Sequence, residues 1–208
     1  MIAALPSLRC PRRDFGEVRA DSEVPPWREM DAHPLVESIS GLAPQQATSI
    51  RLGWTADELR LLFHCADSHI TATLTARDAL LYEEEVVEVF IDPVGDAAAY
   101  FEIEVNPLNA VLDLVLRRNR SGYAQDVSWD CEGLRTAVKK TAQTWTAELA
   151  IPFRSLIGAA PKPGASWRMN FFRIDRPPGV PRELSAWSPT GRNTFHVPER
   201  FGFVEFLE

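Results

Sequence analysis

The stretch YEEEVVEVFID at residues 82–92 decides the fold, because apolar side chains occupy every second position along it. Side chains two residues apart in a β-strand point to the same face, so Val87, Val89 and Ile91 predict one continuous apolar face. Glu88 falls on the opposite face, between large apolar neighbours. A carboxylate in such surroundings is costly to bury unless it meets a partner or a wet cleft. The pattern therefore predicts a strand with one core face and one face that meets a partner or a cleft.

Tyr82 stands at the entrance to this strand and is the first candidate for ligand binding. An aromatic ring can cover the apolar C–H face of a sugar, and a carboxylate can accept hydrogen bonds from its hydroxyl groups. Tyr82 together with Glu88 therefore suits a polyhydroxylated ligand.

The same alternation continues along much of the chain, in segments 59–65, 100–106, 110–117, 144–151, 167–174 and 201–207. Turn sequences at 92–96 and 106–109 link the central strands into an antiparallel meander. Two short helical pieces are expected, at 67–77 and 153–157. Many short strands separated by turns are typical of a β-sandwich or barrel. The prediction is an all-β fold, an antiparallel β-sandwich formed by residues 1–208 as a single domain.

One face of the central meander is expected to carry mostly polar side chains, namely Glu88, Tyr100, Glu102, Glu104, Asn106 and Asp113. A solvated face is the simpler interpretation, because antiparallel sheets commonly have one. The crowding of acids favours instead a face that meets a cation or a hydroxyl-rich ligand, because like charges repel unless such a partner offsets the repulsion.

Composition limits the partners. The net charge of -7 argues against nucleic acid or an anionic membrane, and no segment has the apolar length needed to span a bilayer. The first six residues are too short for a signal peptide and lack a basic flank. A cytoplasmic protein is expected from this sequence, and a secreted one if a leader is missing from it.

The cysteines Cys10, Cys65 and Cys131 are widely spaced and lack metal-ligand spacing. Buried thiols in a reducing compartment are favoured over one disulfide with a spare thiol.

Glu88 and Glu104 raise the possibility of catalysis. On adjacent strands they could lie directly opposite each other, about 5 Å apart, as in retaining glycoside hydrolases. The sequence has no Gly-x-Ser-x-Gly motif and no glycine-rich phosphate loop. Binding requires less than the two-carboxylate geometry, so binding is favoured and hydrolysis stays as the alternative.

Five segments together carry a resemblance to a known family: 82–93, 100–109, 145–153, 167–175 and 186–202. In order and spacing they resemble the family 9 carbohydrate-binding modules and the wider family 9-like group common in bacterial proteins. The resemblance covers roughly residues 50–208 and implies a non-catalytic β-sandwich that binds a mono- or oligosaccharide. Several family members also bind structural calcium, for which the resemblance assigns no ligands here.

The resemblance implies a sugar held between two aromatic rings, at positions matched by Tyr82 and Trp187, with hydrogen bonds from polar side chains. The implied ligand-binding residues are Tyr82, Glu88, Glu104, Asn106, Arg173 and Trp187. The chain departs from the family in two respects. The first ring is tyrosine where tryptophan is usual, and the neighbouring strand has Glu102 and Glu104 where the family uses arginine and amides.

A haem-binding or electron-transfer domain on the related sandwich fold is a further alternative. That function needs axial ligands, commonly methionine with histidine or lysine. Met169 alternates with core residues, which favours a packing role for it.

Overall fold

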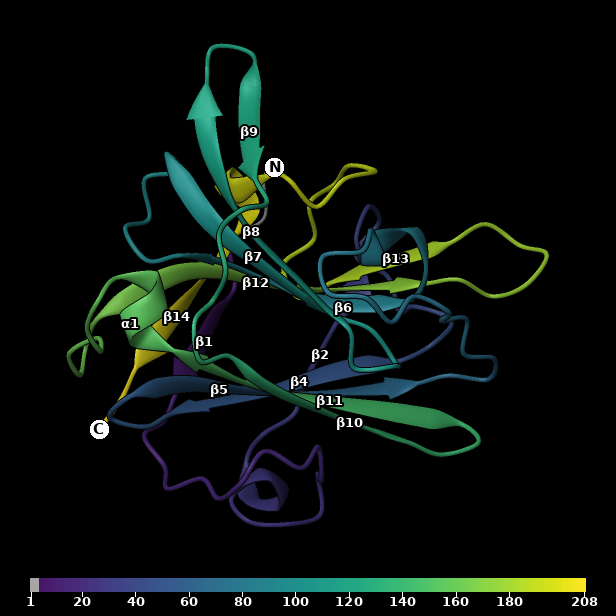
Figure 1. Ribbon diagram of the computed structural model, residues 1–208, viewed down its shortest axis with the longest axis horizontal. Helices are drawn as coiled ribbons and strands as arrows, with labels where there is room; N and C mark the ends of the chain where they lie inside the picture. The colour runs from purple at the N-terminus through teal and green to yellow at the C-terminus, as the bar shows by residue number, and fades with distance from the viewer. Residues whose placement is uncertain (1–3) are drawn as a thin grey trace.

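Two β-sheets pack face to face in the computed structural model, which describes residues 4–208 (Figure 1). Residues 1–3, part of the start considered above, lie outside the described residues. The path of the large sheet is β1 (Ser7–Cys10), β14 (Gly202–Phe206), β12 (Ser166–Asp175), β6 (Val86–Asp92), β7 (Ala99–Val105), β8 (Val111–Asn119) and β9 (Gly122–Asp126), with β13 (Glu183–Ala186) and β3 (Val36–Glu37) paired beside β12. The small sheet has the order β10 (Arg135–Lys140), β11 (Thr144–Pro152), β5 (Glu58–Ala66), β4 (Thr48–Trp54) and β2 (His33–Pro34). The predicted β-sandwich is confirmed.

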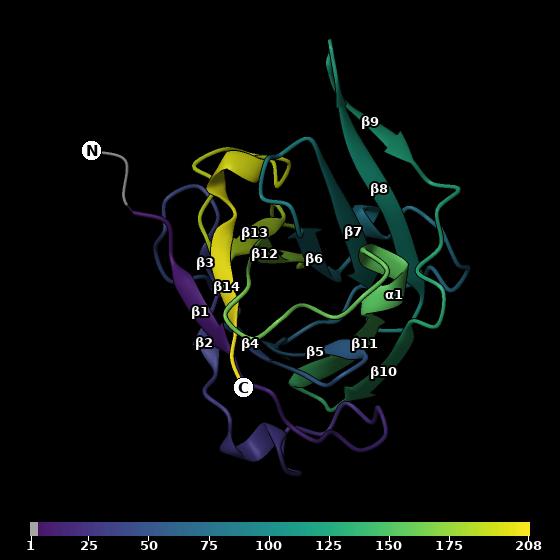
Figure 2. The same cartoon turned by 90° about the vertical axis from the view of Figure 1, so that its left-hand side faces the viewer.

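The strands pair antiparallel, apart from the parallel pair β1–β14. The meander β6–β7–β8 is present as expected, and the β8–β9 hairpin extends beyond the sandwich (Figure 2). Among the described residues, the helical segments are α1 (Phe153–Leu156) and the 3-10 turns η1 (Trp27–Glu29), η2 (Leu81–Glu83) and η3 (Pro198–Arg200). None of these helices is long and apolar enough to cross a membrane.

The helical piece expected at 153–157 is present as α1, but the helix expected at 67–77 is wrong. This segment is a loop whose backbone N–H groups donate to carboxylates instead of to a helical turn. Thr71 donates to Glu85 at 2.9 Å, and Thr73 and Leu74 both donate to Glu84. These acceptors satisfy donors that a helix would pair internally.

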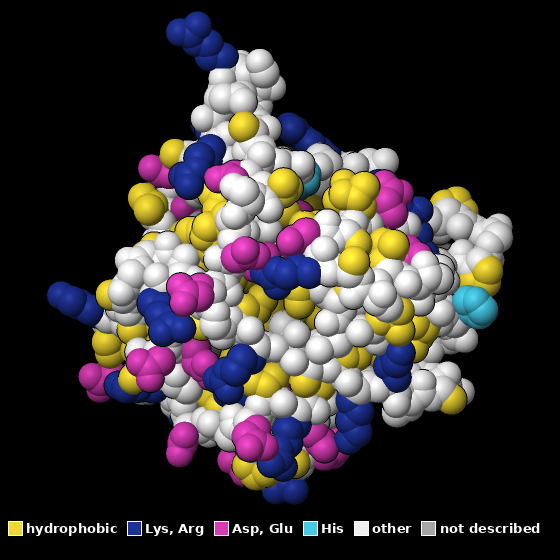
Figure 3. All heavy atoms as spheres, viewed as in Figure 1, with side chains coloured by type: hydrophobic (Ala, Val, Ile, Leu, Met, Phe, Trp, Pro, Cys, Tyr) yellow, Lys and Arg dark blue, Asp and Glu magenta, His cyan; other side chains and the backbone are white. Residues whose placement is uncertain are grey.

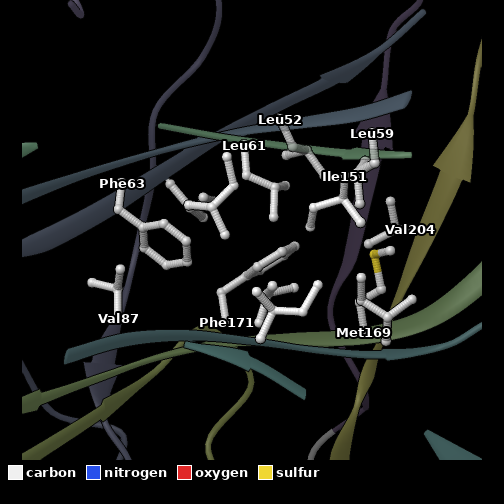
Figure 4. Packing of buried hydrophobic residues seen from close by; sticks show 14 of the residues in the cluster. Leu52, Leu59, Leu61, Phe63, Val87, Ile151, Met169, Phe171 and Val204 are labelled. Atoms are coloured by element: carbon white, nitrogen blue, oxygen red, sulfur yellow. The ribbon is translucent and has the colours of Figure 1, made fainter. Parts of the chain in front are cut away.

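The main core lies between the sheets. Figure 4 shows Leu61 and Phe63 of the small sheet facing Val87 and Phe171 of the large sheet. Val87, Val89 and Ile91 are fully buried there, so the predicted apolar face of β6 is confirmed. Each such side chain contributes about 1.5–3 kcal/mol relative to an exposed position.

The outer face of the large sheet is also buried, so the simpler of the two interpretations, a solvated face, is wrong. A second apolar cluster covers it, made by Val86, Phe90 and Tyr100 of the sheet together with Leu81 and Phe195 of the loops, among others. The loops exclude water from a face that the pattern of polar residues alone would leave wet. Polar side chains on this face are therefore buried and must be accounted for individually.

Asp113 does not share the face of the glutamates, contrary to the expectation. It pairs with Ile103 in the β7–β8 register, whereas Glu104 pairs with Leu112. Because strand faces alternate, a one-residue difference in register moves a side chain to the opposite face.

Cys10, Cys65 and Cys131 are buried free thiols, as predicted. Burial raises the pKa of the Cys65 and Cys131 thiols to about 12. On the surface, acidic and basic side chains are interspersed over the face seen in Figure 3.

Candidate functional site

A pocket of about 270 Å³ lies against the outer face of the large sheet. Strands β6 and β7 supply its acidic side chains, η2 supplies Tyr82, and a loop before β14 supplies its far wall. Its lining residues are Tyr82, Glu88, Glu102, Glu104, Gln125, Ile174, Arg182, Leu184, Asn193, Thr194, Phe195 and His196. Aromatic rings, amides and carboxylates thus converge on one concave site, which is typical of small-ligand binding.

Three glutamates form the acidic part of this pocket, and we call them the glutamate triad: Glu88, Glu102 and Glu104. Glu88 on β6 lies directly opposite Glu104 on β7, and Glu102 precedes Glu104 on the same face of that strand. One carboxylate oxygen from each lies within 4.8 Å of the others. The three side chains are 2%, 4% and 0% exposed. The strand register therefore brings three buried acids to one point.

Four oxygens of the glutamate triad are buried without a hydrogen-bond partner among the described residues: Glu88 Oε1, Glu102 Oε2 and both oxygens of Glu104. Within residues 4–208, no lysine or arginine nitrogen lies within 4.0 Å of these carboxylates. His196 Nδ1 lies 3.9 Å from Glu102 Oε2, but burial lowers the pKa of this imidazole and favours its neutral form. The same nitrogen is 2.9 Å from the Tyr100 hydroxyl.

Burial also keeps protons on the triad. It raises the pKa of Glu102 to about 7. The pKa values of Glu88 and Glu104 are raised well above the usual range, first by burial and then by the charges of their acidic neighbours. Arg182 in the same pocket partly opposes the shift at Glu88. Ionisation of all three carboxyl groups is therefore costly unless a further positive charge compensates them.

Two further acidic clusters differ from the triad because each holds an arginine. In the first, formed by Asp67, Glu85 and Asp175, Arg173 donates to Asp67 at 2.9 Å and to Asp175 at 3.0 Å. In the second, formed by Asp78, Asp113 and Asp130, Arg77 contacts all three carboxylates. A guanidinium already compensates the charge in both clusters.

Of the six ligand-binding residues inferred from the sequence, the structure brings three together in the pocket: Tyr82, Glu88 and Glu104. Tyr82 is half-buried, so part of its ring is available to a ligand. The remaining three lie elsewhere, each for a physical reason.

Asn106 shapes a turn. Its side-chain oxygen accepts hydrogen bonds from the backbone N–H groups of Leu108 and Ala110, and its amide donates to the carbonyl of Leu74 at 2.7 Å. All of these contacts lie inside the protein, where Asn106 is fully buried. The expectation that it binds a sugar is therefore wrong.

Arg173 points to the inner face of the large sheet. Besides Asp67 and Asp175, its guanidinium donates to Thr48 and to the carbonyl of Ala66, and its side chain is 1% exposed. It ties β12 of the large sheet to β4 and β5 of the small sheet. Arg173 thus stabilises the sandwich and does not reach the pocket.

Trp187 lies in the main core, so the expected slot between Tyr82 and Trp187 is not formed. The residue is 8% exposed, and its ring lies 5.7 Å from that of Phe171, centroid to centroid. Its backbone N–H donates to Phe171, which continues the pairing of β13 beside β12 and turns the side chain inward. The ring lies directly over Gly202, where a Cβ atom would overlap it.

The sequence did not identify the far wall of the pocket. Arg182, Asn193 and His196 come from irregular segments that have no periodic pattern. Phe195 is 6% exposed and stacks on Phe172 at 4.2 Å between centroids. An aromatic residue within the polar stretch 191–196 was the one available signal.

A β-sandwich with a pocket of aromatic, amide and carboxylate groups on one sheet is a ligand-binding architecture. Comparison with known families identifies a match: the sequence profile of the carbohydrate family 9 binding domain-like family matches residues 21–208. The chain therefore belongs to this family, as the resemblance implied.

Several individual proteins are similar to this chain. A protein of Arthroderma benhamiae named "Extracellular protein" is 26% identical over 187 residues, 82% of this chain and 83% of its own length. The crystal structure of a Bacteroides uniformis protein has a TM-score of 0.78 at 18% identity and covers 98% of this chain and 100% of its own. A family 9 carbohydrate-binding module of Caldicellulosiruptor kristjanssonii, in complex with cellotriose, has a TM-score of 0.74 at 15% identity and covers 97% and 94%. At these identities, the structural similarity establishes the shared fold.

Proposed function

We propose that this chain binds a carbohydrate in the pocket between Tyr82 and Phe195 and does not cleave it. The observation that carries the proposal is the convergence of Tyr82, Glu88 and Glu104 on one concave site. Family membership supports it, as do the complexes of the Caldicellulosiruptor module with cellotriose and with glucose.

In this proposal, Tyr82 provides a one-sided platform for the apolar face of a sugar ring. The ring is half-buried and lies at the pocket wall, whereas Trp187 is in the core. Arg182, Asn193 and Gln125 supply donors and acceptors for hydroxyl groups from the wall.

A second pocket, of about 350 Å³, adjoins the first and shares Arg182, Leu184 and Asn193 with it. A ligand longer than one sugar unit could extend from one pocket into the other. We therefore favour an oligosaccharide whose terminal unit lies on Tyr82.

The glycoside hydrolase alternative rests on Glu88 and Glu104, which lie opposite each other on adjacent strands. A retaining enzyme needs one ionised nucleophile beside one protonated acid. Burial raises the pKa of both residues, and neither is held as a carboxylate by a cationic neighbour within 4.0 Å among the described residues. This environment favours binding over hydrolysis.

The haem alternative rests on Met169. Its side chain is fully buried between the sheets (Figure 4) and belongs to the same apolar cluster as Trp167 and Val204. This position supports a packing role for the methionine.

The test is a calorimetric titration with mono- and disaccharides. Tyr82→Ala should weaken binding roughly tenfold, because one aromatic contact contributes about 1–1.5 kcal/mol. Phe203→Ala is the matched control, since this ring is 42% exposed and does not line the pocket. Equal affinities in both variants, or turnover of aryl glycosides that Glu88→Gln abolishes, would contradict the proposal.

A further inference from the structure

We propose that the glutamate triad is a binding site for one oxygen-preferring divalent cation, of which Ca²⁺ is the best-fitting example. The site is built from Glu88 of β6 and from Glu102 and Glu104 of β7.

The spacing of the oxygens fits such an ion. Ca²⁺ binds oxygen ligands at about 2.3–2.6 Å, so two ligands of one ion can lie up to about 5 Å apart. The three carboxylate oxygens lie within 4.8 Å of one another. One ion between them can therefore contact all three side chains.

The partnerless oxygens provide independent evidence that something is held there. Glu104 is 0% exposed, and neither of its oxygens accepts a well-formed hydrogen bond among the described residues. The Tyr82 backbone N–H and the Glu102 carboxyl group lie close enough to affect the pKa of Glu104, but neither supplies a positive charge. Glu88 Oε1 and Glu102 Oε2 are also buried without a hydrogen-bond partner among the described residues. Arg182 lines the same pocket and its charge lowers the pKa of Glu88, but within residues 4–208 it makes no ion pair within 4.0 Å of the triad. Buried polar groups are nearly always satisfied, and buried acids without a cation in contact are costly. A divalent cation would bind these oxygens and offset most of their charge.

The other acidic clusters of the chain show what distinguishes the triad. Arg173 occupies the cluster of Asp67, Glu85 and Asp175, and Arg77 occupies the cluster around Asp113. A guanidinium repels an incoming cation and takes up acceptor oxygens, here those of Asp67 and Asp175 but not Glu85 Oε2, which is buried without a partner among the described residues. Among the described residues, the glutamate triad is the three-acid cluster without an arginine in contact.

The burial of the oxygens favours a bare ion over the ammonium group of an amino sugar. The four partnerless oxygens have almost no surface accessible to solvent, so a small ion fits between them more readily than a substituent on a sugar ring. Ca²⁺ takes 6–8 oxygen ligands in flexible geometry, which leaves coordination positions for water or for ligand hydroxyl groups. The cation site and the proposed sugar site share Glu88 and Glu104. The calcium titration is therefore run without sugar, and the comparison of Tyr82→Ala with Phe203→Ala tests sugar binding separately.

The experiment titrates CaCl₂ into EDTA-treated, dialysed protein without sugar, by calorimetry and by thermal unfolding. We expect one ion per chain and a midpoint that rises by about 5–10 °C at 100 times the dissociation constant. Glu104→Gln should abolish both signals. Glu85→Gln is the matched control, a buried acid in the arginine-containing cluster, and should keep them.

Folding of the test variant is checked in the metal-free state. Glu104→Gln removes one acid from a crowded cluster, so its metal-free midpoint should equal or exceed that of the parent. Glu102→Gln is the second variant if Glu104→Gln does not fold. The proposal is overturned if calcium gives neither signal, if the signals survive in Glu104→Gln, or if they disappear in Glu85→Gln alone. It is also overturned if glucosamine binds the metal-free protein and calcium does not.

Discussion

Replacing Trp187 with alanine should destabilise the protein strongly and leave sugar affinity unchanged. The ring is 8% exposed, lies over Gly202 and packs beside Phe171 of the adjacent strand β12. Truncating a buried aromatic residue costs about 3–5 kcal/mol, because the transfer free energy is lost and a cavity remains. For a chain of this size, that corresponds to a fall of about 6–20 °C in the melting temperature.

The informative comparison is with Tyr82→Ala. Tyr82 is half-buried at the pocket wall, so its truncation should cost only about 1–2 kcal/mol of stability. Its removal should instead weaken sugar binding. Trp187→Ala should thus lose stability and keep its affinity for sugar. Tyr82→Ala should lose affinity and keep most of its stability.

Guanidinium unfolding followed by tryptophan fluorescence gives the stabilities, and calorimetric titration below the lowest melting temperature gives the affinities. The reasoning is refuted if Trp187→Ala keeps its midpoint and loses affinity, because the ring would then be a sugar platform. A second check is Gly202→Ala. Its penalty should be smaller in the Trp187→Ala background, because part of the steric overlap is with the Trp187 ring.

Three further predictions concern buried polar groups. Asn106→Ala should cost about 2–4 kcal/mol in urea unfolding without a change in sugar affinity, because it leaves the turn around it unsatisfied; a loss of affinity at unchanged stability would contradict this. Arg173→Ala should cost about 3–5 kcal/mol, because Asp67 and Asp175 would remain buried without their partner; a near-neutral result would show that those acids are solvated. In EDTA, stability should fall as the pH rises from about 4.5 to 7, because the raised pKa of Glu102 means that the native state holds a proton that the unfolded state releases. The slope from this group is at most about 1.4 kcal/mol per pH unit, and Glu102→Gln should reduce it; an unchanged slope in this variant would rule out Glu102 as its source.

Most of the sheet structure could be predicted from the sequence, because alternation is a local property of each strand. The segment 86–92 matches β6, and 144–151 falls within β11. It was harder to predict which side chains of neighbouring strands share one face of the sheet, because this depends on the pairing register between the strands. Asp113 was assigned to the wrong face for this reason, although its own strand was predicted.

The candidate site could be predicted on strands β6 and β7 and at Tyr82, which directly precedes the β6 segment in η2. Glu88 and Glu104 followed from alternation and adjacency, and their direct pairing is observed. Asn106 was misassigned because its polar atoms are used by its own turn, which spacing alone does not reveal. Phe195 and His196 were missed because loops reach the pocket through tertiary packing, for which no local pattern exists.

The alternation that builds the core of this protein also creates the acidic site. Val87 and Val89 must face the small sheet to be buried, and this requirement sends Glu88 to the outer face. Ile103 fixes Glu102 and Glu104 in the same way. A one-residue register shift would therefore place the acids in the apolar core, at a far greater cost than their mutual repulsion. Larger shifts are opposed because β6 is paired in register with both β7 and β12. The remaining ways to relieve the repulsion are retention of protons or binding of a counter-ion. These two ways make opposite predictions for the calcium titration, since an ion that binds at neutral pH must displace protons from the triad. Burial also raises the pKa of Glu85 in the Arg173 cluster to about 8, so proton release by itself does not identify the site. Proton release measured in two buffers of different ionisation enthalpy, and its loss in Glu104→Gln but not in Glu85→Gln, would therefore show that the ion is bound at the triad.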